Sequence, residues 1–195
     1  MSVDDDTKGS EGSIKVDDIK GSKRSIYVDG ACNKLTGAYG WASVTDCKGK
    51  CLLTHYRDTV FAESAFEFMG FESKTKGSFT VIRAKFSDVV SQQCNGAELV
   101  AMVAGLQIMK AHPAEFSFLY SDSNTVVRSW SNGISNAKDP KKLKLIKQCM
   151  LLKAETGDRV KFVSGDDNVA DLGFHKKKRK RVDDVNEPDP KRRKI

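Results

Sequence analysis

The sequence predicts an α/β domain in which a mixed, five-stranded β-sheet is flanked by α-helices. Three observations lead to this fold class. Short apolar runs separated by turn residues come first, a long run with helical periodicity follows, and residues 116–120 then form an apolar run without polar alternation. A run of this last kind is typical of a strand that is buried on both faces of a sheet. Because a strand that follows a helical crossover can lie parallel to an earlier one, this order of elements predicts a mixed sheet.

The first three strands are expected to pair antiparallel. Residues 26–28 form the first strand, and residues 39–45 alternate in polarity as the second. Gly49 lies in a turn that reverses the chain, so residues 51–60 are predicted to be the third strand.

The segment at residues 61–92 has two interpretations, which the sequence leaves open. It is either an insertion in the third strand or an extra hairpin. In both cases the apolar residues 79–86 are expected to form a strand.

Helices and strands alternate in the second half of the chain. Residues 97–109 carry Leu99, Val103 and Leu106 at helical spacing, and Pro113 ends this helix. The other expected elements are a strand at 116–120, a short helix at 123–130, a helix at 141–154, a strand at 159–164 and a short helix at 168–173.

The helix at residues 141–154 begins after Pro140 and is closed by Gly157. Its apolar stripe is expected to contain Leu143, Ile146 and either Cys149 or Met150.

Charge divides the 195 residues into three parts. The chain carries a net charge of +7, but residues 1–22 contain six acidic and three basic residues. We expect these residues to be a disordered leader, residues 23–175 to be the folded domain, and residues 176–195 to be a basic disordered tail. A basic balance fits a nucleic-acid partner.

The sequence contains no signal peptide and no apolar run long enough to span a bilayer, so no membrane partner is expected. An odd count of five cysteines without a framework spacing favours reduced thiols inside a cell.

Four acidic residues occur where such a fold brings elements together. Asp29 and Asp122 each follow a predicted strand, and sites in α/β sheets form at the carboxyl ends of parallel strands. Glu98 lies at the start of the long helix, and Asp171 lies in the last one. Taken singly, each has an ordinary explanation as a turn residue, a helix cap or a residue that favours the helix dipole.

Taken together, these carboxylates predict a metal site. Four carboxylates in one crevice would repel each other at neutral pH unless cations neutralised them. Ligands that offer only oxygen favour Mg²⁺ or Mn²⁺ over zinc. Two such ions are the means by which nucleases hold the attacking and leaving oxygens of a phosphodiester.

The residues around these acids resemble the type 1 ribonucleases H, from Ser25 to about Gly173. The motifs that carry the resemblance are YVDGAC at 27–32, GAYGWA at 37–42, NGAELVA at 95–101, YSDSNTV at 120–126 and NVAD at 168–171. The resemblance implies a ribonuclease H-like fold and an endonuclease that hydrolyses the RNA strand of RNA–DNA hybrids. The products would carry 5′-phosphate and 3′-hydroxyl ends.

The resemblance also implies roles for the acidic residues and for the residues that contact substrate. Asp29 would bridge two metal ions, Asp171 would help to hold the ion that activates water, and Glu98 and Asp122 would help to hold the ion that stabilises the leaving oxygen. Small residues after Asp29 would let RNA approach closely, and 2′-hydroxyl groups separate RNA from DNA there. The implied substrate contacts are Gly30, Ala31, Cys32, Cys94, Asn95, Gly96 and Ser123.

The sequence departs from the family pattern in its last motif. Asn168 and Asp171 are one residue closer than in the family, so Asp166 or Asp167 is an alternative fourth ligand. The loop at 164–168 also lacks the histidine that many members carry. A catalytically degraded nucleic-acid-binding module of the same fold is therefore the alternative function. An exonuclease, an integrase or a resolvase of the same superfamily is a third hypothesis, and the absence of an Asp-x-Glu pattern at Asp29 disfavours the exonuclease.

Two basic clusters separated by acidic residues make the tail resemble a nuclear localisation signal. We expect a nuclear protein that acts as a monomer and whose tail binds a nuclear import receptor. The clusters consist of Lys176, Lys177, Lys178, Arg179, Lys180 and Arg181, followed by Lys191, Arg192, Arg193 and Lys194.

Overall fold

The computed structural model describes most of the predicted domain. The predicted leader, the basic tail and residues 172–175 lie outside the described residues. None of the helices in the described part is long and apolar enough to cross a membrane. The described residues are 23–32, 39–61, 67–76, 79–87 and 94–171.

The described part of the chain contains a six-stranded mixed sheet in the order β3-β4-β2-β1-β5-β6. The central strand β1 pairs antiparallel with β2 and parallel with β5. This is the mixed α/β sheet expected for a ribonuclease H-like fold, with six strands where five were predicted. The strands are β1 (Arg24–Cys32), β2 (Tyr39–Asp46), β3 (Glu67–Lys76), β4 (Phe79–Ser87), β5 (Phe116–Ser121) and β6 (Val160–Phe162).

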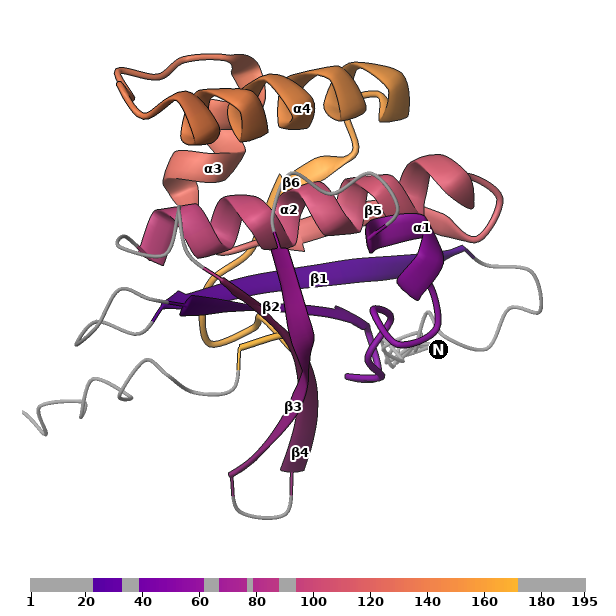
Figure 1. The fold of residues 1–195 in the computed structure, drawn as a ribbon. Helices are drawn as coiled ribbons and strands as arrows, with labels where there is room; N and C mark the ends of the chain where they lie inside the picture. The colour runs from indigo at the N-terminus through magenta and orange to yellow at the C-terminus, as the bar shows by residue number, and fades with distance from the viewer. Residues whose placement is uncertain (1–22, 33–38, 62–66, 77–78, 88–93, 172–195) are drawn as a thin grey trace, which may run out of the picture.

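The described helices form layers on one side of this sheet (Figure 1). The long helix α2 packs on β1 and β2, and α4 packs on α2. Asp139 starts α4 by accepting a hydrogen bond from the backbone N–H of Lys141 at 2.9 Å, as an N-cap residue does. The helices are α1 (Arg57–Phe61), α2 (Cys94–Ala111), α3 (Asn124–Arg128), the 3₁₀ helix η2 (Trp130–Asn132) and α4 (Pro140–Thr156).

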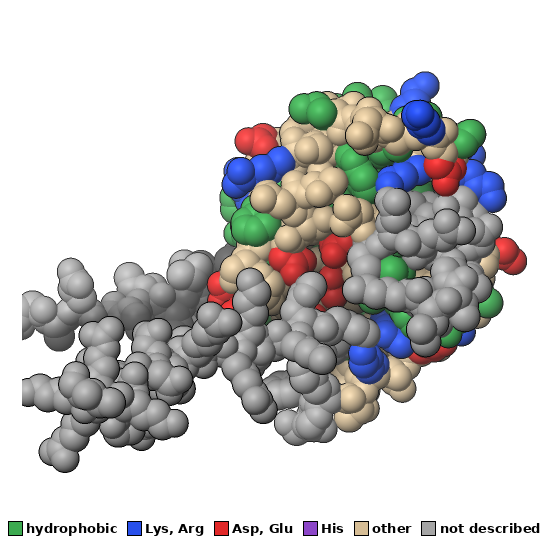
Figure 2. Space-filling model, turned by 90° about the vertical axis from the view of Figure 1, so that its left-hand side faces the viewer, with side chains coloured by type: hydrophobic (Ala, Val, Ile, Leu, Met, Phe, Trp, Pro, Cys, Tyr) green, Lys and Arg blue, Asp and Glu red, His purple; other side chains and the backbone are tan. Residues whose placement is uncertain are grey.

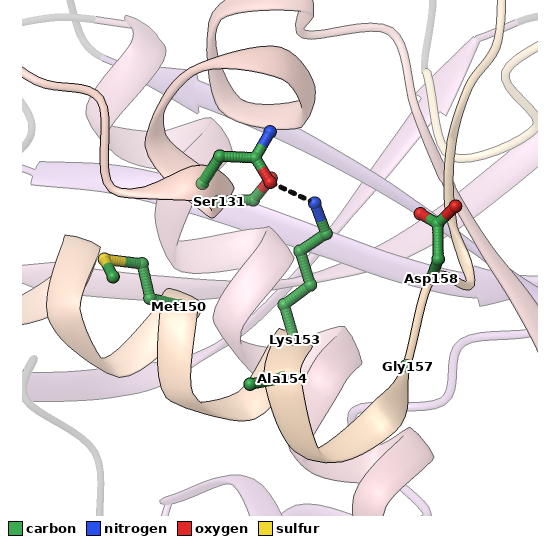
Figure 3. A pocket seen from close by; sticks show the side chains of 7 residues that line it. Ser131, Met150, Lys153, Ala154, Gly157 and Asp158 are labelled. Atoms are coloured by element: carbon green, nitrogen blue, oxygen red, sulfur yellow. Dashed lines mark hydrogen bonds between the residues drawn. The ribbon is translucent and has the colours of Figure 1, made fainter.

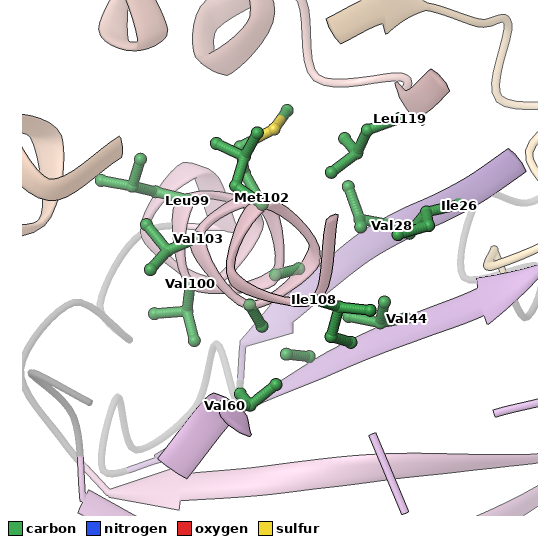
Figure 4. Packing of buried hydrophobic residues seen from close by; sticks show 14 of the residues in the cluster. Ile26, Val28, Val44, Val60, Leu99, Val100, Met102, Val103, Ile108 and Leu119 are labelled. Atoms are coloured by element: carbon green, nitrogen blue, oxygen red, sulfur yellow. The ribbon is translucent and has the colours of Figure 1, made fainter. Parts of the chain in front are cut away.

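The core lies between α2 and the sheet. A Cβ atom at Gly105 would lie 2.7 Å from a methyl group of Leu119 and 2.9 Å from one of Val28, so the glycine lets α2 cross β1 and β5 closely. Leu99 and Val103 are fully buried, as their helical spacing predicted. In Figure 4, Val28 and Leu119 lie on one side of the helix, and Leu99 and Val103 lie on its other side, so apolar side chains surround α2.

The predicted third strand at residues 51–60 is wrong. Leu52 and Leu53 are adjacent in sequence and both are buried, whereas neighbours in a strand point to opposite faces. The backbone N–H groups of His55 and Tyr56 both donate to the carbonyl of Leu52, which makes a helical turn ahead of α1. Only Cys51 makes a β-bridge to β2 in this segment.

The segment at residues 61–92 contains an extra hairpin, one of the two arrangements that the sequence allowed. β3 and β4 pair antiparallel, and β4 joins the sheet beside β2. The register shifts between Phe68 and Gly70, so Phe68 and Phe71 both pack near Phe61. This bulge hides the alternation by which a strand is recognised in a sequence.

Two helices differ from their predictions. α4 buries Ile146 and Cys149, but Leu143 and Met150 are 43% and 40% exposed. Residues 168–171 form a turn instead of the start of a helix, with the N–H of Asp171 bonded to the carbonyl of Asn168 at 2.9 Å.

We expect Gly30→Ala to destabilise the fold by about 3 kcal/mol, because overpacking a dense contact costs this much. The new Cβ would overlap the backbone of Ala97 and Glu98 and lie 2.5 Å from the Ala97 carbonyl oxygen. Urea denaturation would measure the loss.

Gly49→Ala is the control, because its Cβ would meet no heavy atom within 4 Å and its φ of +76° adds only the strain of a left-handed residue, roughly 1–2 kcal/mol. Equal losses in the two variants would contradict the packing role of Gly30.

Candidate active site

Asp29 lies within β1, at the point where its parallel neighbour ends. The last paired residues of β1 and β5 are Val28 and Ser121, and β1 continues to Cys32. The sequence analysis placed Asp29 directly after a strand that ended at Val28, whereas β1 continues to Cys32. Because β5 stops there, one flank of Asp29 is open to side chains from other elements.

Gly30 brings Glu98 to this open flank. Helix α2 begins at Cys94, three residues earlier than predicted, so Glu98 lies in its second turn instead of its first. The absent side chain of Gly30 lets the backbone at Ala97 and Glu98 pack directly on β1. The sequence analysis attributed the small size of Gly30 to the approach of RNA, and the structure adds a packing role in the contact between β1 and α2.

Three carboxylates meet at this place. Asp29, Glu98 and Asp122 each offer an oxygen, and these oxygens all lie within 4.8 Å of one another. Asp122 directly follows β5, so one residue within β1, one just after β5 and one in the second turn of α2 supply the three groups. Asp29 is 5% exposed, and the other two are half-buried. Figure 2 shows acidic side chains grouped on one face of the molecule.

The electrostatics of Asp29 favour the binding of a cation beside it. Burial raises the pKa of Asp29 well above its ordinary value, and the nearby carboxylates of Asp122 and Asp171 raise it further. The backbone N–H of Gly30 donates to Oδ1 of Asp29 at 2.8 Å, which favours the ionised form and lowers the pKa in part. The charged form of Asp29 is therefore held in an unfavourable environment.

Asn168 ties the last turn of the described chain to the carboxylates. Its side-chain amide is buried and donates to the carbonyl of Val28 and to Oδ1 of Asp122, both at 3.0 Å. Its own Oδ1 accepts from the N–H of Ala170 at 3.1 Å. Asn168 therefore orients Asp122 and, through the turn that it begins, sets the position of Asp171. The sequence marks Asn168 only as part of its last motif.

Of the three candidates for a fourth ligand, Asp171 is the one whose charge acts on Asp29. Asp171 is half-buried and contributes to the raised pKa of Asp29. Asp166 and Asp167 are exposed in the preceding turn, and Asp167 accepts a hydrogen bond from Ser164 Oγ at 2.6 Å.

The predicted substrate contacts lie on both sides of the carboxylates. Ala31 and Cys32 are half-buried at the end of β1, and α2 begins with Cys94, an exposed Asn95 and a buried Gly96. The contact at Gly30 brings these two segments together. Ser123 is buried after β5, and its N–H donates to Ser121 Oγ at 3.1 Å.

The donor set fits Mg²⁺ or Mn²⁺. Both are hard ions that prefer carboxylate oxygens, and the three clustered residues offer only such oxygens. A cation would also offset the repulsion that raises the pKa of Asp29.

A separate pocket of about 480 Å³ lies between η2 and α4 (Figure 3). It contains none of the predicted site residues. In this pocket Lys153 donates to the side-chain carbonyl of Asn132, and the other lining residues are Ser131, Met150, Ala154, Gly157 and Asp158.

Several solved structures are similar to this chain. The N-terminal RNase H domain of Rv2228c from Mycobacterium tuberculosis is 21% identical with a TM-score of 0.43, and the match covers 75% of this chain and 85% of that one. RNase H1 from Halobacterium salinarum is 17% identical with a TM-score of 0.40, covering 76% and 91%. LC11-RNase H1, isolated from compost and solved with an RNA/DNA hybrid, is 17% identical with a TM-score of 0.42, covering 75% and 88%.

No protein-family model matches this chain, and no curated protein matches it in sequence. With identities of 21% or less and TM-scores below 0.5, the structural similarities transfer no activity, substrate or metal to this chain.

We expect Asp29→Asn to stabilise the metal-free protein at neutral pH, since the amide cannot carry the charge that burial and the neighbouring carboxylates disfavour. Because the pKa of Asp29 is raised on folding, the unfolded chain loses this proton first. The wild type therefore loses stability as pH rises from about 4 through the raised pKa, and the variant lacks this loss. Thermal unfolding in EDTA across this pH range would measure the difference.

Asp158→Asn is the control, because that side chain is 86% exposed. Adding Mg²⁺ should stabilise the wild type and the control but not Asp29→Asn. A metal-free Asp29→Asn protein less stable than the wild type at neutral pH would contradict the unfavourable environment of this carboxylate.

Proposed function

We propose that the chain is a metal-dependent ribonuclease H that cleaves the RNA strand of RNA–DNA hybrids internally and leaves 5′-phosphate and 3′-hydroxyl ends. The observation that carries the proposal is the meeting of Asp29, Glu98 and Asp122 oxygens within 4.8 Å of one another. The ordered motifs that resemble the type 1 ribonucleases H support the choice of substrate.

Asp29, Glu98, Asp122 and Asp171 would hold two ions of Mg²⁺ or Mn²⁺. Such ions supply a water of lowered pKa and charge stabilisation for the attacking and leaving oxygens of a phosphodiester. The chain's own groups set the geometry of these ligands. Gly30 N–H fixes one oxygen of Asp29, and Asn168 fixes one oxygen of Asp122.

Recognition of the RNA strand is assigned to the two segments that flank the carboxylates. Residues 30–32 end β1 and residues 94–96 begin α2, and the first segment packs on the helix through Gly30. Backbone groups of these segments are suited to read 2′-hydroxyls in the wide minor groove of an A-like duplex. A substrate with DNA in both strands lacks these hydroxyls and would bind without being cut.

Cleavage of a labelled RNA–DNA hybrid with Mg²⁺ or Mn²⁺ tests the proposal. The wild type should cut only the RNA strand, and chelation by EDTA should stop the reaction. Asp29→Asn and Asp171→Asn should each lose activity on the order of 10²–10³-fold, the usual effect of removing one group that stabilises developing charge. Asp158→Asn, at an exposed position, should keep it.

Three outcomes would correct this proposal in different ways. Activity retained in Asp171→Asn and lost in Asp166→Asn or Asp167→Asn would move the fourth ligand into the preceding turn. Binding of the hybrid without cleavage by the wild type would favour the catalytically degraded binding module. Cleavage without metal would remove the carboxylates from the proposed role.

The basic clusters at residues 176–181 and 191–194 are proposed to direct the chain to the nucleus through an import receptor. A fluorescent reporter fused to residues 176–195 should accumulate in nuclei, and replacing both clusters with glutamine should abolish the accumulation. Replacing Asp183, Asp184 and Glu187 with glutamine is the control. A reporter that stays evenly distributed would overturn this assignment.

A further inference from the structure

A group of aromatic and charged side chains crosses three strands beside the candidate active site. We call it the aromatic–basic strip, and it consists of Tyr39 and Trp41 on β2, Arg83 and Lys85 on β4, and Glu72 on β3. All five side chains are partly exposed.

The members of the strip contact one another closely. The guanidinium of Arg83 lies over the Trp41 ring at 4.0 Å, and the ammonium of Lys85 lies over the Tyr39 ring at 4.2 Å. Glu72 binds both cations, with Lys85 at 3.0 Å and Arg83 at 3.3 Å. It also accepts a hydrogen bond from Trp41 Nε1 at 2.7 Å. The strip is therefore ordered before any ligand binds, which lowers the entropy lost on binding.

The strand register places the strip on the same face of the sheet as Asp29. Trp41 pairs with Ala31, which points to the same side as Asp29 because the two are separated by one residue. Trp41 also pairs with Lys85, and Glu72 pairs with Arg83, so the same side continues across β4 and β3. Helix α2 packs against the opposite side, the side of Val28.

The spacing between the strip and the site suits a nucleic-acid strand. Trp41 lies one strand away from β1 and two residues further along it than Asp29, which separates their backbones by about 8 Å. That distance corresponds to two or three nucleotides of a stacked strand, at about 3.4 Å each.

The charge of the strip also suits phosphate groups. Two cations share one carboxylate, so the five residues keep a net charge of +1. Lys74 lies two residues beyond Glu72 on the same side of β3 and adds another positive charge. The ion pairs of Glu72 with Arg83 and Lys85 are ordinary pairs between neighbouring strands, and they need no ligand to explain them. The excess of positive charge beside half-exposed rings is the combination found where proteins bind single-stranded nucleic acid.

We propose that the aromatic–basic strip binds unpaired nucleotides that extend from the hybrid, with bases on Tyr39 and Trp41 and phosphates on Lys85, whose side chain is more exposed than that of Arg83. The bases within a duplex are stacked on each other, so only unpaired bases are available to the two rings. This inference rests on the proposed function, and it assigns the chain a preference for hybrids that carry a single-stranded extension.

Fluorescence anisotropy of the full chain without divalent metal tests this proposal. The probes are a blunt RNA–DNA hybrid and the same hybrid with a short extension, placed on each strand in turn. The wild type should bind one extended hybrid roughly tenfold more tightly than the blunt one, the usual effect of stacking one base. The double variant Trp41→Leu/Lys85→Met should lose this advantage and bind the blunt hybrid within about twofold of the wild type.

The matched control is Phe118→Leu/Lys161→Met. It removes the same chemistry elsewhere on the sheet, where Lys161 lies over the Phe118 ring at 5.9 Å. The control should keep the advantage of the extended hybrid. An advantage that is absent in the wild type, kept by the strip variant or lost equally in the control would overturn the proposal.

Two further measurements separate the possible failures. Lys85→Met alone removes one charge at a partly exposed position and is the variant to use if the double variant does not fold. It should reduce the slope of log affinity against log salt concentration by nearly one, because one phosphate contact is lost. Cleavage of the blunt hybrid reports on the proposed function alone. Cutting of the blunt hybrid without any preference for an extension would refute the proposed role of the strip and leave the ribonuclease assignment intact.

Discussion

Asp29 is buried beside other carboxylates, and much of the fold around it accommodates that one unfavourable placement. β1 runs past the end of β5, so side chains from two other elements reach Asp29. Gly30 lets α2 approach closely enough to deliver Glu98, and Asn168 holds Asp122 in place. Without a cation these contacts gather like charges, which lowers the stability of the fold. The same contacts prepare the ligands, so that a bound ion would need little rearrangement of the protein.

The sequence predicted the central elements well because each has a clear local pattern. Val28 and Leu119 mark buried strands, and Leu99 and Val103 mark α2, which is buried on all sides from Leu99 to Met109. The prediction failed between β2 and α2, where local patterns mislead. Leu52 and Leu53 look like part of an apolar strand, but their backbone forms a helical turn. The bulge at Gly70 breaks the alternation of β3, so that strand could not be recognised.

The candidate site was predicted because Asp29 and Asp122 follow apolar runs, and in the structure the parallel pairing of β1 and β5 ends directly before these two residues. The support for these acids could not be predicted, because it depends on contacts over long separations in sequence. Asn168 donates to Val28, 140 residues away, and no local pattern reports such a bond. The contact of Gly30 with Ala97 and Glu98 could not be predicted either, since these residues are far from it in the sequence.

The two outer strands of the described sheet bear on aggregation. β3 carries the bulge at Gly70 and several charged side chains, and β6 is only three residues long with Lys161 at its centre. Open edges of sheets are templates on which strands of other molecules add, and bulges, short strands and lysines are the usual protections. Both ends of this sheet therefore resist growth into fibrils, even though the partly exposed rings of Tyr39 and Trp41 lie close to one of them.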